Sequence, residues 1–421
     1  MFESVFYQSA VQQLAADIAG ASLAPSLLFS GPAFSGKGTA ALELARICSC
    51  GNPESLACEC SSCKHHRILS HPDLLMLGPR DFSAEIAASA AAFARDRSLK
   101  TLLVRAIRKL LGRFAPVLLE DDPKFSKIGG LIVSLEENLG ELYTLPEDTT
   151  PEQVQKQIDS LTKDAFKLES EGMSDSIPIA HIRRAGVWAH LSPTSNAKVL
   201  LIENADRMQE GSRNALLKLL EEPPEYLSIV LTTPREKALL PTILSRVRPY
   251  RFTKRDRESE IIQKVFHEKS DLDIGTYLGS FLPVKESSLR PLAALFAASV
   301  ARAGIRECQR RRKENPDHLI ALGKYATPCA EKAGLGKGDE HVNITIEKIL
   351  DATDKFSLRG SFSRFLASLL AVVAESRGLS PASGDVWRKS VTEANQGVEI
   401  YNQTPALAME RLSFDLGRNL V

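Results

Sequence analysis

The sequence predicts a parallel α/β domain followed by a region built almost wholly of helices, within a chain of 421 residues. Three observations lead to this fold class. Short apolar runs alternate with helical stretches as far as residue 252, a glycine-rich loop follows the first of these runs, and strand-type patterns fade after residue 252. Strands that alternate with helices are typical of a parallel sheet with helices on its faces.

Four short apolar runs have the length and composition of buried strands. They cover residues 26–30, 74–77, 198–202 and 227–231. Apolar periodicity predicts helices over residues 39–47, 84–113 and 212–222, and a further helix through Ile182 and Trp188. The helix over 212–222 is expected to stop at Pro223 and Pro224, because proline cannot continue a helix.

The overall composition is that of an ordinary globular protein with a formal net charge of +1. No global field draws such a chain to nucleic acid or to an anionic membrane, so binding of that kind needs a local patch. No apolar run approaches the ~18 residues of a membrane helix, and the first residues do not have the pattern of a signal peptide. We therefore expect a cytoplasmic protein with no membrane partner.

Residues 31–37 fit the phosphate-loop pattern G-x-x-x-x-G-K. Gly31 and Gly36 would let backbone N–H groups surround phosphate oxygens, and Lys37 would reach the terminal phosphates. The hydroxyl that normally follows the lysine and holds Mg²⁺ is missing, because position 38 is glycine. Thr39 comes one residue late, about 100° further round the helix. A glycine turn that merely begins a helix is the simpler alternative, but the preceding strand and the following helix favour phosphate binding.

A second acidic motif follows the apolar run 198–202. ATPases with a phosphate loop need an acid at the end of a second strand to hold Mg²⁺, and usually another group to orient the attacking water. Here the pair is Glu203 and Asn204. Glu203 can still reach a metal, whereas the amide of Asn204 is not a base at physiological pH. The alternative is a strand that ends in an ordinary polar turn.

These motifs occur in the order found in a known family, together with His71-Pro72-Asp73, IENAD at 202–206, NALLKLLEEPP at 214–224, Thr232-Thr233 and PTILSR at 241–246. The chain resembles the clamp-loader subunits of bacterial DNA polymerase III, which are AAA+ ATPases, and in particular their delta-prime type. The resemblance is strong over residues 1–80 and 177–252. It does not extend to residues 81–176, which we interpret as a helical insertion.

The resemblance implies an AAA+ domain over residues 1–252, with a zinc loop at 48–66 and the helical insertion at about 81–176. A small helical lid at 253–300 and a helical collar at 301–421 would follow. The implied function is that of a largely non-hydrolysing subunit that helps to load the sliding clamp on primed DNA. Its implied partners are the gamma/tau and delta subunits, the sliding clamp and primed-template DNA within the complex.

The resemblance also assigns roles to single residues. Arg246 corresponds to an arginine finger directed at the ATP site of the neighbouring subunit. A degenerate nucleotide site is implied, and whether it still binds ATP is left open; its residues are Gly31, Gly36, Lys37, Thr39, Glu203 and Thr232. Arg213 and Lys218 lie on the helix that resembles the one lining the central chamber of the loader. They are candidates for phosphate contacts with DNA, or an ordinary exposed pair.

Five of the seven cysteines fall between residues 48 and 63, and in a cytosolic protein such clustering favours metal over disulfides. Cys50, Cys58, Cys60 and Cys63 offer four thiolates, which suits a tetrahedral structural zinc. The family spacing is similar but slightly longer. Cys48 is a possible substitute ligand, His65 and His66 could compete, and a set of free thiols is the alternative.

Three other functions are consistent with parts of the sequence. An active gamma/tau-type ATPase is disfavoured by Gly38 and Asn204, and ATP turnover of the isolated chain would decide. A phosphotransferase with a phosphate loop lacks any recognisable substrate pocket here. A zinc protein that binds nucleic acid alone is disfavoured by the near-neutral charge, and salt-dependent DNA binding would support it.

Overall fold

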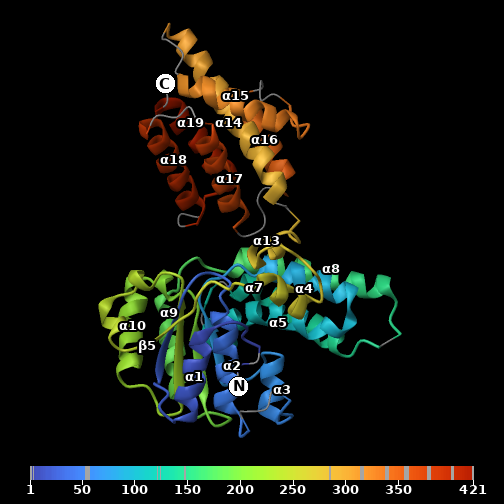
Figure 1. Ribbon diagram of the computed structural model, residues 1–421, viewed down its shortest axis with the longest axis vertical. Coiled ribbons are helices and arrows are strands. Elements are labelled where there is room, and N and C mark those ends of the chain that lie inside the picture. The colour runs from blue at the N-terminus through green and yellow to red at the C-terminus, as the bar shows by residue number, and fades with distance from the viewer. Residues whose placement is uncertain are drawn as a thin grey trace. The chain divides into compact units, whose positions relative to one another are not determined.

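The structure, a computed structural model, describes residues 2, 4–52, 57–120, 122–123, 125–146, 148–283, 286–312, 317–336, 341–354, 360–376, 381–399 and 403–419. It divides into two compact units, Met1–Phe281 and Leu282–Val421 (Figure 1). The boundaries expected from the sequence lie after residues 252 and 300 instead. Helix α14, Glu286–Arg310, runs without a break through residue 300.

The first unit is built on a parallel sheet with the strand order β2-β3-β4-β1-β5. The strands are β1 Ser26–Ser30, β2 Leu74–Leu77, β3 Lys198–Ile202, β4 Leu227–Thr233 and β5 Arg248–Arg251. The four expected strands and the parallel α/β class are confirmed. Because parallel strands end at the same edge, the segments that follow β1, β3 and β4 lie close together there.

Alternate residues along the strands pack into two separate cores, one on each face of the sheet. Leu27 and Phe29 face helices α1, Ser9–Ala19, and α2, Lys37–Ser49. Leu28 faces α9, Ile179–His190, and α10, Glu210–Glu221. The sheet is therefore covered by helices on both faces, which explains why strands β1 to β4 are largely apolar.

Strand β5 was not expected from the sequence. Its residues, RPYR, alternate in burial, and only Tyr250 is buried. A strand at the edge of a sheet tolerates Pro249 and charged side chains, because one side of its backbone needs no ladder partner. Such a strand leaves no apolar run in the sequence.

Residues 81–176, here called the helical segment, lie between β2 and β3 in the sequence. They form a helical bundle with a hydrophobic core of its own. Its helices are α4 Ser83–Arg95, η1 Arg97–Leu99, α5 Lys100–Leu111, η2 Gly112–Phe114, α6 Pro116–Leu119, α7 Phe125–Tyr143 and α8 Pro151–Gly172. The single helix expected over 84–113 is wrong. Asp96 has an extended backbone and its carboxylate accepts the N–H of Ser98 at 2.9 Å, which ends α4 and starts η1.

The remaining short elements of the first unit connect these parts and extend beyond β5. They are α3 Ser61–Arg67, η3 Ala205–Arg207, η4 Glu236–Ala238, α11 Pro241–Leu244, α12 Glu258–Phe266 and α13 Ile274–Gly279. Helices α12 and α13 pack their apolar residues against Ala88 and Ala92 of α4. The segment after β5 therefore shares a core with the helical segment.

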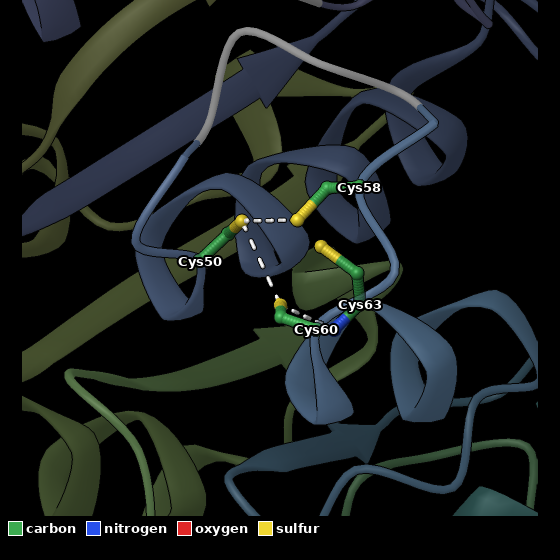
Figure 2. Close-up of side chains that lie close together, drawn as sticks. All are labelled: Cys50, Cys58, Cys60 and Cys63. Atoms are coloured by element: carbon green, nitrogen blue, oxygen red, sulfur yellow. Dashed lines mark hydrogen bonds between the residues drawn. The ribbon is translucent and has the colours of Figure 1, made fainter.

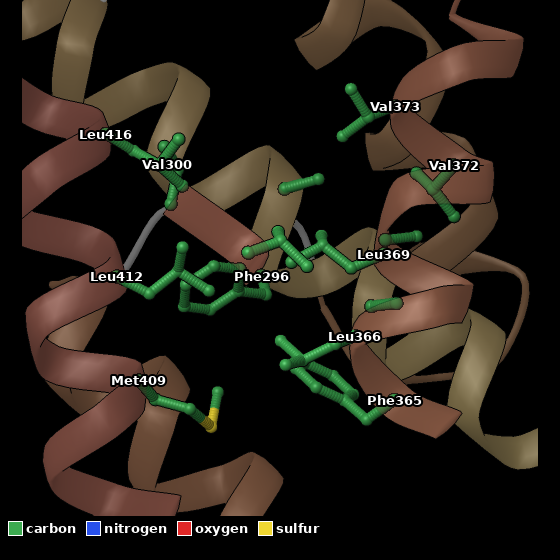
Figure 3. Packing of buried hydrophobic residues seen from close by; sticks show 14 of the residues in the cluster. Phe296, Val300, Phe365, Leu366, Leu369, Val372, Val373, Met409, Leu412 and Leu416 are labelled. Carbon is green, nitrogen blue, oxygen red and sulfur yellow. The ribbon is translucent and has the colours of Figure 1, made fainter. Parts of the chain in front are cut away.

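The second unit is wholly helical in its described residues. Its helices are α14 Glu286–Arg310, α15 Asp317–Glu331, α16 Val342–Ala352, α17 Ser361–Glu375, α18 Pro381–Glu399 and α19 Pro405–Asn419. Figure 3 shows its core, where Phe296 of α14 lies between Leu369 of α17 and Leu412 of α19. Among the described residues, neither unit has a helix with the length and apolar character needed to cross a bilayer.

Candidate functional site

The phosphate loop lies at the carboxyl end of β1 and leads into α2. Gly31 and Gly36 both have positive φ, at 147° and 93°, so the loop needs glycine at both positions. The ammonium group of buried Lys37 turns back on the loop and donates to the carbonyl of Gly31 at 2.7 Å and to Ser35 Oγ at 3.2 Å. Burial lowers the pKa of Lys37 to about 8, although the charge of Glu203 opposes this shift.

Glu203 follows β3 and lies beside this loop, as the sequence predicted, but its carboxylate is already paired. Arg113, from η2 of the helical segment, forms an ion pair with it, and Arg80 lies 3.7 Å away on the other oxygen. Both side chains of the Arg113–Glu203 pair are buried. Burial raises the pKa of Glu203, but the charges of Arg113, Arg80 and Lys109 outweigh it, and the pKa lies below its usual value.

The ion pair belongs to a larger network whose other members, Arg80, Glu85 and Lys109, are half-buried. Glu85 of α4 accepts hydrogen bonds from Arg80 and from Lys109 of α5. The network thus holds three cations, Arg80, Lys109 and Arg113, against two carboxylates. Burial opposes ionisation of Glu85, yet Arg80 and Lys109 lower its pKa to about 2. Glu203 is therefore an ionised but neutralised group, and a divalent metal would have to displace guanidinium to bind it.

Gly38 accommodates this arrangement. A Cβ atom at position 38 would lie 2.8 Å from Oε1 of Glu203, inside van der Waals contact. A serine or threonine there would compete with the Glu203 carboxylate for the same space. Thr39, the candidate substitute, is half-buried one residue further along α2. The absence of a side chain at position 38 therefore leaves room for the Glu203 carboxylate in its paired position.

The remaining residues at this edge serve structural hydrogen bonds. Asn204 has φ 51°, donates from its side-chain amide to the carbonyl of Pro79 at 2.7 Å, and donates its backbone N–H to Thr232 Oγ1 at 3.4 Å. The hydroxyl of Thr233 donates to Asp206 at 2.7 Å, and Arg235 pairs with the same carboxylate. These contacts hold the ends of β3 and β4 together and offer no free base.

A buried arginine that the sequence analysis did not select also reaches the loop. Arg255 follows β5 and is 8% exposed, and a Cβ atom on Gly36 would lie 2.1 Å from its Nη2. Among the described residues, its Nε has no hydrogen-bond partner. Neither Arg255 nor Arg113 belongs to a recognisable motif, so only the three-dimensional arrangement reveals them. The sole signal for Arg113 was the basic stretch 95–113, which we interpreted as packing on the acidic half of the helical segment.

The predicted metal ligands do come together (Figure 2). The sulfur atoms of Cys50, Cys58, Cys60 and Cys63 all lie within 4.8 Å of one another. Cys50 Sγ is 3.6 Å from Cys58 Sγ and 3.9 Å from Cys60 Sγ, close to the ~3.8 Å expected between thiolates about 2.3 Å from a tetrahedral zinc. The N–H groups of Asn52 and Cys63 donate to Cys50 Sγ and Cys60 Sγ, which favours thiolates. The donor set therefore fits zinc; residues 53–56 of this loop lie outside the described residues.

The competing ligands lie elsewhere. Cys48 is not part of the four-cysteine group. It packs against the core that contains Leu27 and Phe29 of β1, and burial raises its pKa to about 11. His65 Nδ1 lies 2.8 Å from the carbonyl oxygen of Ser61. His66 is buried and stacks on His71 with ring centroids 4.2 Å apart. Spacing alone could not separate these candidates from the four cysteines, because the separation depends on the packing of α2 and α3.

Arg246 lies after α11 and is half-exposed. It donates to the carbonyl of Thr242 at 2.8 Å and to the carboxylate of Glu221 at 2.7 Å. An ion pair in water is worth ~0–1 kcal/mol, so this contact is readily exchanged for another partner. The family motif at 214–224 supplies Glu221, so the two motifs meet on one surface.

The two candidate DNA contacts differ in environment. Arg213 is half-buried and donates to the carbonyl of Asp206 at 3.4 Å. Lys218 is exposed and lines a groove of about 730 Å³ between α9 and α10. Five residues apart on a helix, the two side chains point about 140° away from each other. The structure therefore does not bring them together.

The chain was compared with known proteins. It is 40% identical to DNA polymerase III subunit gamma/tau of Mycobacterium tuberculosis over 58 residues, 14% of this chain and 10% of that protein. It is 37% identical to DNA polymerase III subunit delta' of Pseudomonas aeruginosa over 84 residues, 20% of this chain and 26% of that protein. The chain thus covers only a tenth to a quarter of the length of these relatives.

A gamma subunit-related protein of DNA polymerase III from Thermotoga maritima, of known structure, superimposes with a TM-score of 0.41. Its sequence identity is 15%, over 98% of this chain and 99% of that one.

A family comparison covers more of the chain. Residues 7–115 and 144–256, together just over half of the sequence, match one family. The unmatched gap, 116–143, is shorter than the segment 81–176 that the sequence analysis set apart. The matched residues contain the phosphate loop, the four cysteines, Glu203 and Arg246. The chain belongs to the family described as "DNA polymerase III, delta subunit".

Proposed function

We propose that the chain is a delta-prime-type subunit of the bacterial DNA polymerase III clamp loader that does not itself hydrolyse ATP. In this role it works in the cytoplasm with gamma/tau and delta subunits, helping to place the sliding clamp on primed-template DNA. The observation that carries the proposal is the buried Arg113–Glu203 ion pair beside Gly38. An ATPase of this class needs a carboxylate and a hydroxyl for Mg²⁺, and neither is available here.

In this proposal residues 1–252 act as an AAA+ domain, residues 253–300 as its lid and residues 301–421 as the collar that assembles with sister subunits. The helical bundle of α14–α19 supports an assembly role, because it carries a large core of its own and none of the site residues. The exposed Lys218, and Arg213 on the same helix, would contact DNA phosphates inside the assembled ring.

The cysteine cluster would hold one structural zinc. Four thiolates leave no open position for a substrate, so the metal would stabilise the loop between α2 and α3 and take no part in chemistry. The buried Arg46 supports this role, since it donates to Cys63 Sγ at 3.5 Å and also pairs with Glu43. Hydrogen bonds of this kind orient metal-bound thiolates.

Arg246 would act on the ATP site of the adjacent subunit. Its present partner, Glu221, is half-exposed, so the guanidinium can leave it at little cost when a γ-phosphate is presented. Stabilisation of charge in the transition state by an arginine supplied in trans is worth ~10³–10⁵ in rate in GTPases. Lysine would substitute poorly, because it lacks the planar fork.

Reconstitution of the loader with Arg246→Ala tests this proposal. Folding and assembly should be intact, while ATP hydrolysis stimulated by the clamp and DNA should fall. Arg251→Ala is the matched control, because Arg251 is also an exposed arginine with a carboxylate partner, Glu236. Equal hydrolysis rates for the wild-type and Arg246→Ala complexes would exclude the trans-acting role.

A further inference from the structure

Arg255 is a buried cation without a compensating partner. In the described part of the chain its side chain forms no ion pair, and its Nε–H donates to no partner. The nearest acidic influence is Glu258, whose carboxylate accepts the N–H of Ile274 at 2.7 Å. Burial accordingly lowers the pKa of Arg255. A buried charge that lacks a partner is costly, so a structure that keeps one is suited to receive an anion.

The guanidinium of Arg255 is directed at the one place where an anion would bind. It packs on Gly36, the N-cap of α2, which is a helix of 13 residues. The first N–H groups of a helix have no partner within the helix and carry partial positive charge. Lys37 brings a second cation to the same turn. Two independent features, an unpaired buried guanidinium and a helix N-terminus, therefore converge on this loop.

Positive charge also reaches the loop from the side where Mg²⁺ would bind. A Cβ atom on Gly38 would lie 3.9 Å from Arg80 Nη1, so this guanidinium borders the same residue. Arg80, Lys109 and Arg113 pair with Glu85 and Glu203, and the charges of Asp81 and Glu169 also act on Arg80. The positive charge available to an anion at the loop therefore comes mainly from Lys37 and Arg255.

We propose that the phosphate loop is a metal-independent site for a di- or triphosphate group, with Arg255 as a direct ligand and Arg80 supplying charge where Mg²⁺ usually does. Guanidinium groups bind phosphate oxygens through charged, often bidentate hydrogen bonds. The bound group would be held and not hydrolysed, since the site has no free carboxylate to orient water. The proposal goes beyond the role in clamp loading and does not depend on it.

Calorimetric titration of the full chain tests the proposal, with inorganic pyrophosphate and with ADP, each in Mg²⁺-free buffer without chelator and in excess Mg²⁺. We expect both ligands to bind without Mg²⁺, and Mg²⁺ to give no gain in affinity, because the metal competes with the protein for the phosphates. Equal affinities for the two ligands would mean that phosphate alone is recognised, and tighter ADP binding that the nucleoside also contributes. Absence of binding without Mg²⁺, or binding only with Mg²⁺, would overturn the proposal.

Variants identify the residue responsible. Arg255→Gln should weaken pyrophosphate binding at least about tenfold, which matches the loss of one charged hydrogen bond. Arg255→Lys should recover part of the loss. Arg257→Gln is the matched control, since Arg257 is an exposed arginine two residues away. Unchanged binding in Arg255→Gln, with a melting temperature equal to that of the wild type, would contradict the assignment. Tighter binding would contradict it as well, because it would mean that the guanidinium blocks the loop.

Discussion

In the proposed function, Glu203 is a residue that has lost a catalytic role without being replaced. The carboxylate at the end of β3 is retained, but a guanidinium from 90 residues earlier in the chain neutralises it. Gly38 leaves the space in which that carboxylate lies. The Glu203 carboxylate is thus part of an ion-pair network, so substitutions in this network are predicted to affect stability.

Arg113→Met should strongly destabilise the first unit. Removing one partner of a buried ion pair leaves the other charge uncompensated and costs about 3–5 kcal/mol. The double variant Arg113→Met, Glu203→Gln should lose less than Arg113→Met alone, because the side chain that has lost its guanidinium partner is then neutral. Urea unfolding measures both, with the exposed Arg251→Ala as a control that should change by less than about 1 kcal/mol. Equal losses for Arg113→Met and Arg251→Ala would contradict the burial of this pair.

The same network predicts the response to acid. Glu85 and Glu203 both have a lower pKa in the folded chain than their usual value of 4.5, and that of Glu85 is about 2. Their contribution to stability is therefore complete above about pH 4.5 and is lost as the pH falls toward 2. Urea unfolding at a series of pH values should show this decline, and the double variant should show a shallower one. Identical pH profiles for the double variant and the wild type would argue against the network.

Sequence motifs predicted some site residues well and others not at all. Lys37, Glu203 and the four cysteines lie within short local sequence patterns. In the structure Lys37 and Glu203 lie at the phosphate loop, and the four cysteines lie together in one cluster. Arg113 and Arg255 act only through tertiary contacts with Glu203 and Gly36. No local pattern distinguishes such an arginine from one on a solvated surface, so these residues could not be predicted.

At the scale of elements, the four cysteines connect the end of α2 with the start of α3. Cys60 is exposed, and only Cys50 and Cys63 are buried. Binding of a metal is coupled to the folding of the loop that supplies its ligands. In the proposed function, a zinc ion held by these cysteines should therefore contribute to stability.

Protein purified without chelator should contain about one zinc per chain. Cys63→Ser should lower the zinc content and the melting temperature together, because one of four ligands is lost. Cys48→Ala is the matched control and should leave the zinc content unchanged, since Cys48 lies outside the cluster. Elemental analysis makes the measurement. A metal-free wild-type chain that is folded and assembles would rule the site out.

The predictable and unpredictable elements differ in their burial. The central strands and the edge strand β2 could be predicted, because the runs 26–30, 74–77, 198–202 and 227–231 are apolar. Strand β5 could not, because its exposed arginines and Pro249 resemble a loop. The break between helices at Asp96 was missed as well. A single capping residue is a weak signal in the sequence, and the apolar periodicity that predicts a helix continues on both sides of it.

At the scale of the whole molecule, the chain combines an α/β unit that carries every candidate site residue with a separate helical unit. The family match ends at residue 256 and so covers the first unit only. The helical unit has a continuous core from α14 to α19, which suits a structural part of an assembly. The central claim is that the first unit retains the loop of an ATPase while its metal site has been replaced by ion pairs.

ATP turnover by the isolated chain, measured with and without Mg²⁺, tests this claim most directly. The account predicts hydrolysis at background in both conditions, because each ~1.36 kcal/mol of lost transition-state stabilisation costs tenfold in rate and both metal contacts are gone. Robust Mg²⁺-dependent hydrolysis that Lys37→Ala abolishes would contradict it, and would mean that Glu203 leaves Arg113 to bind the metal.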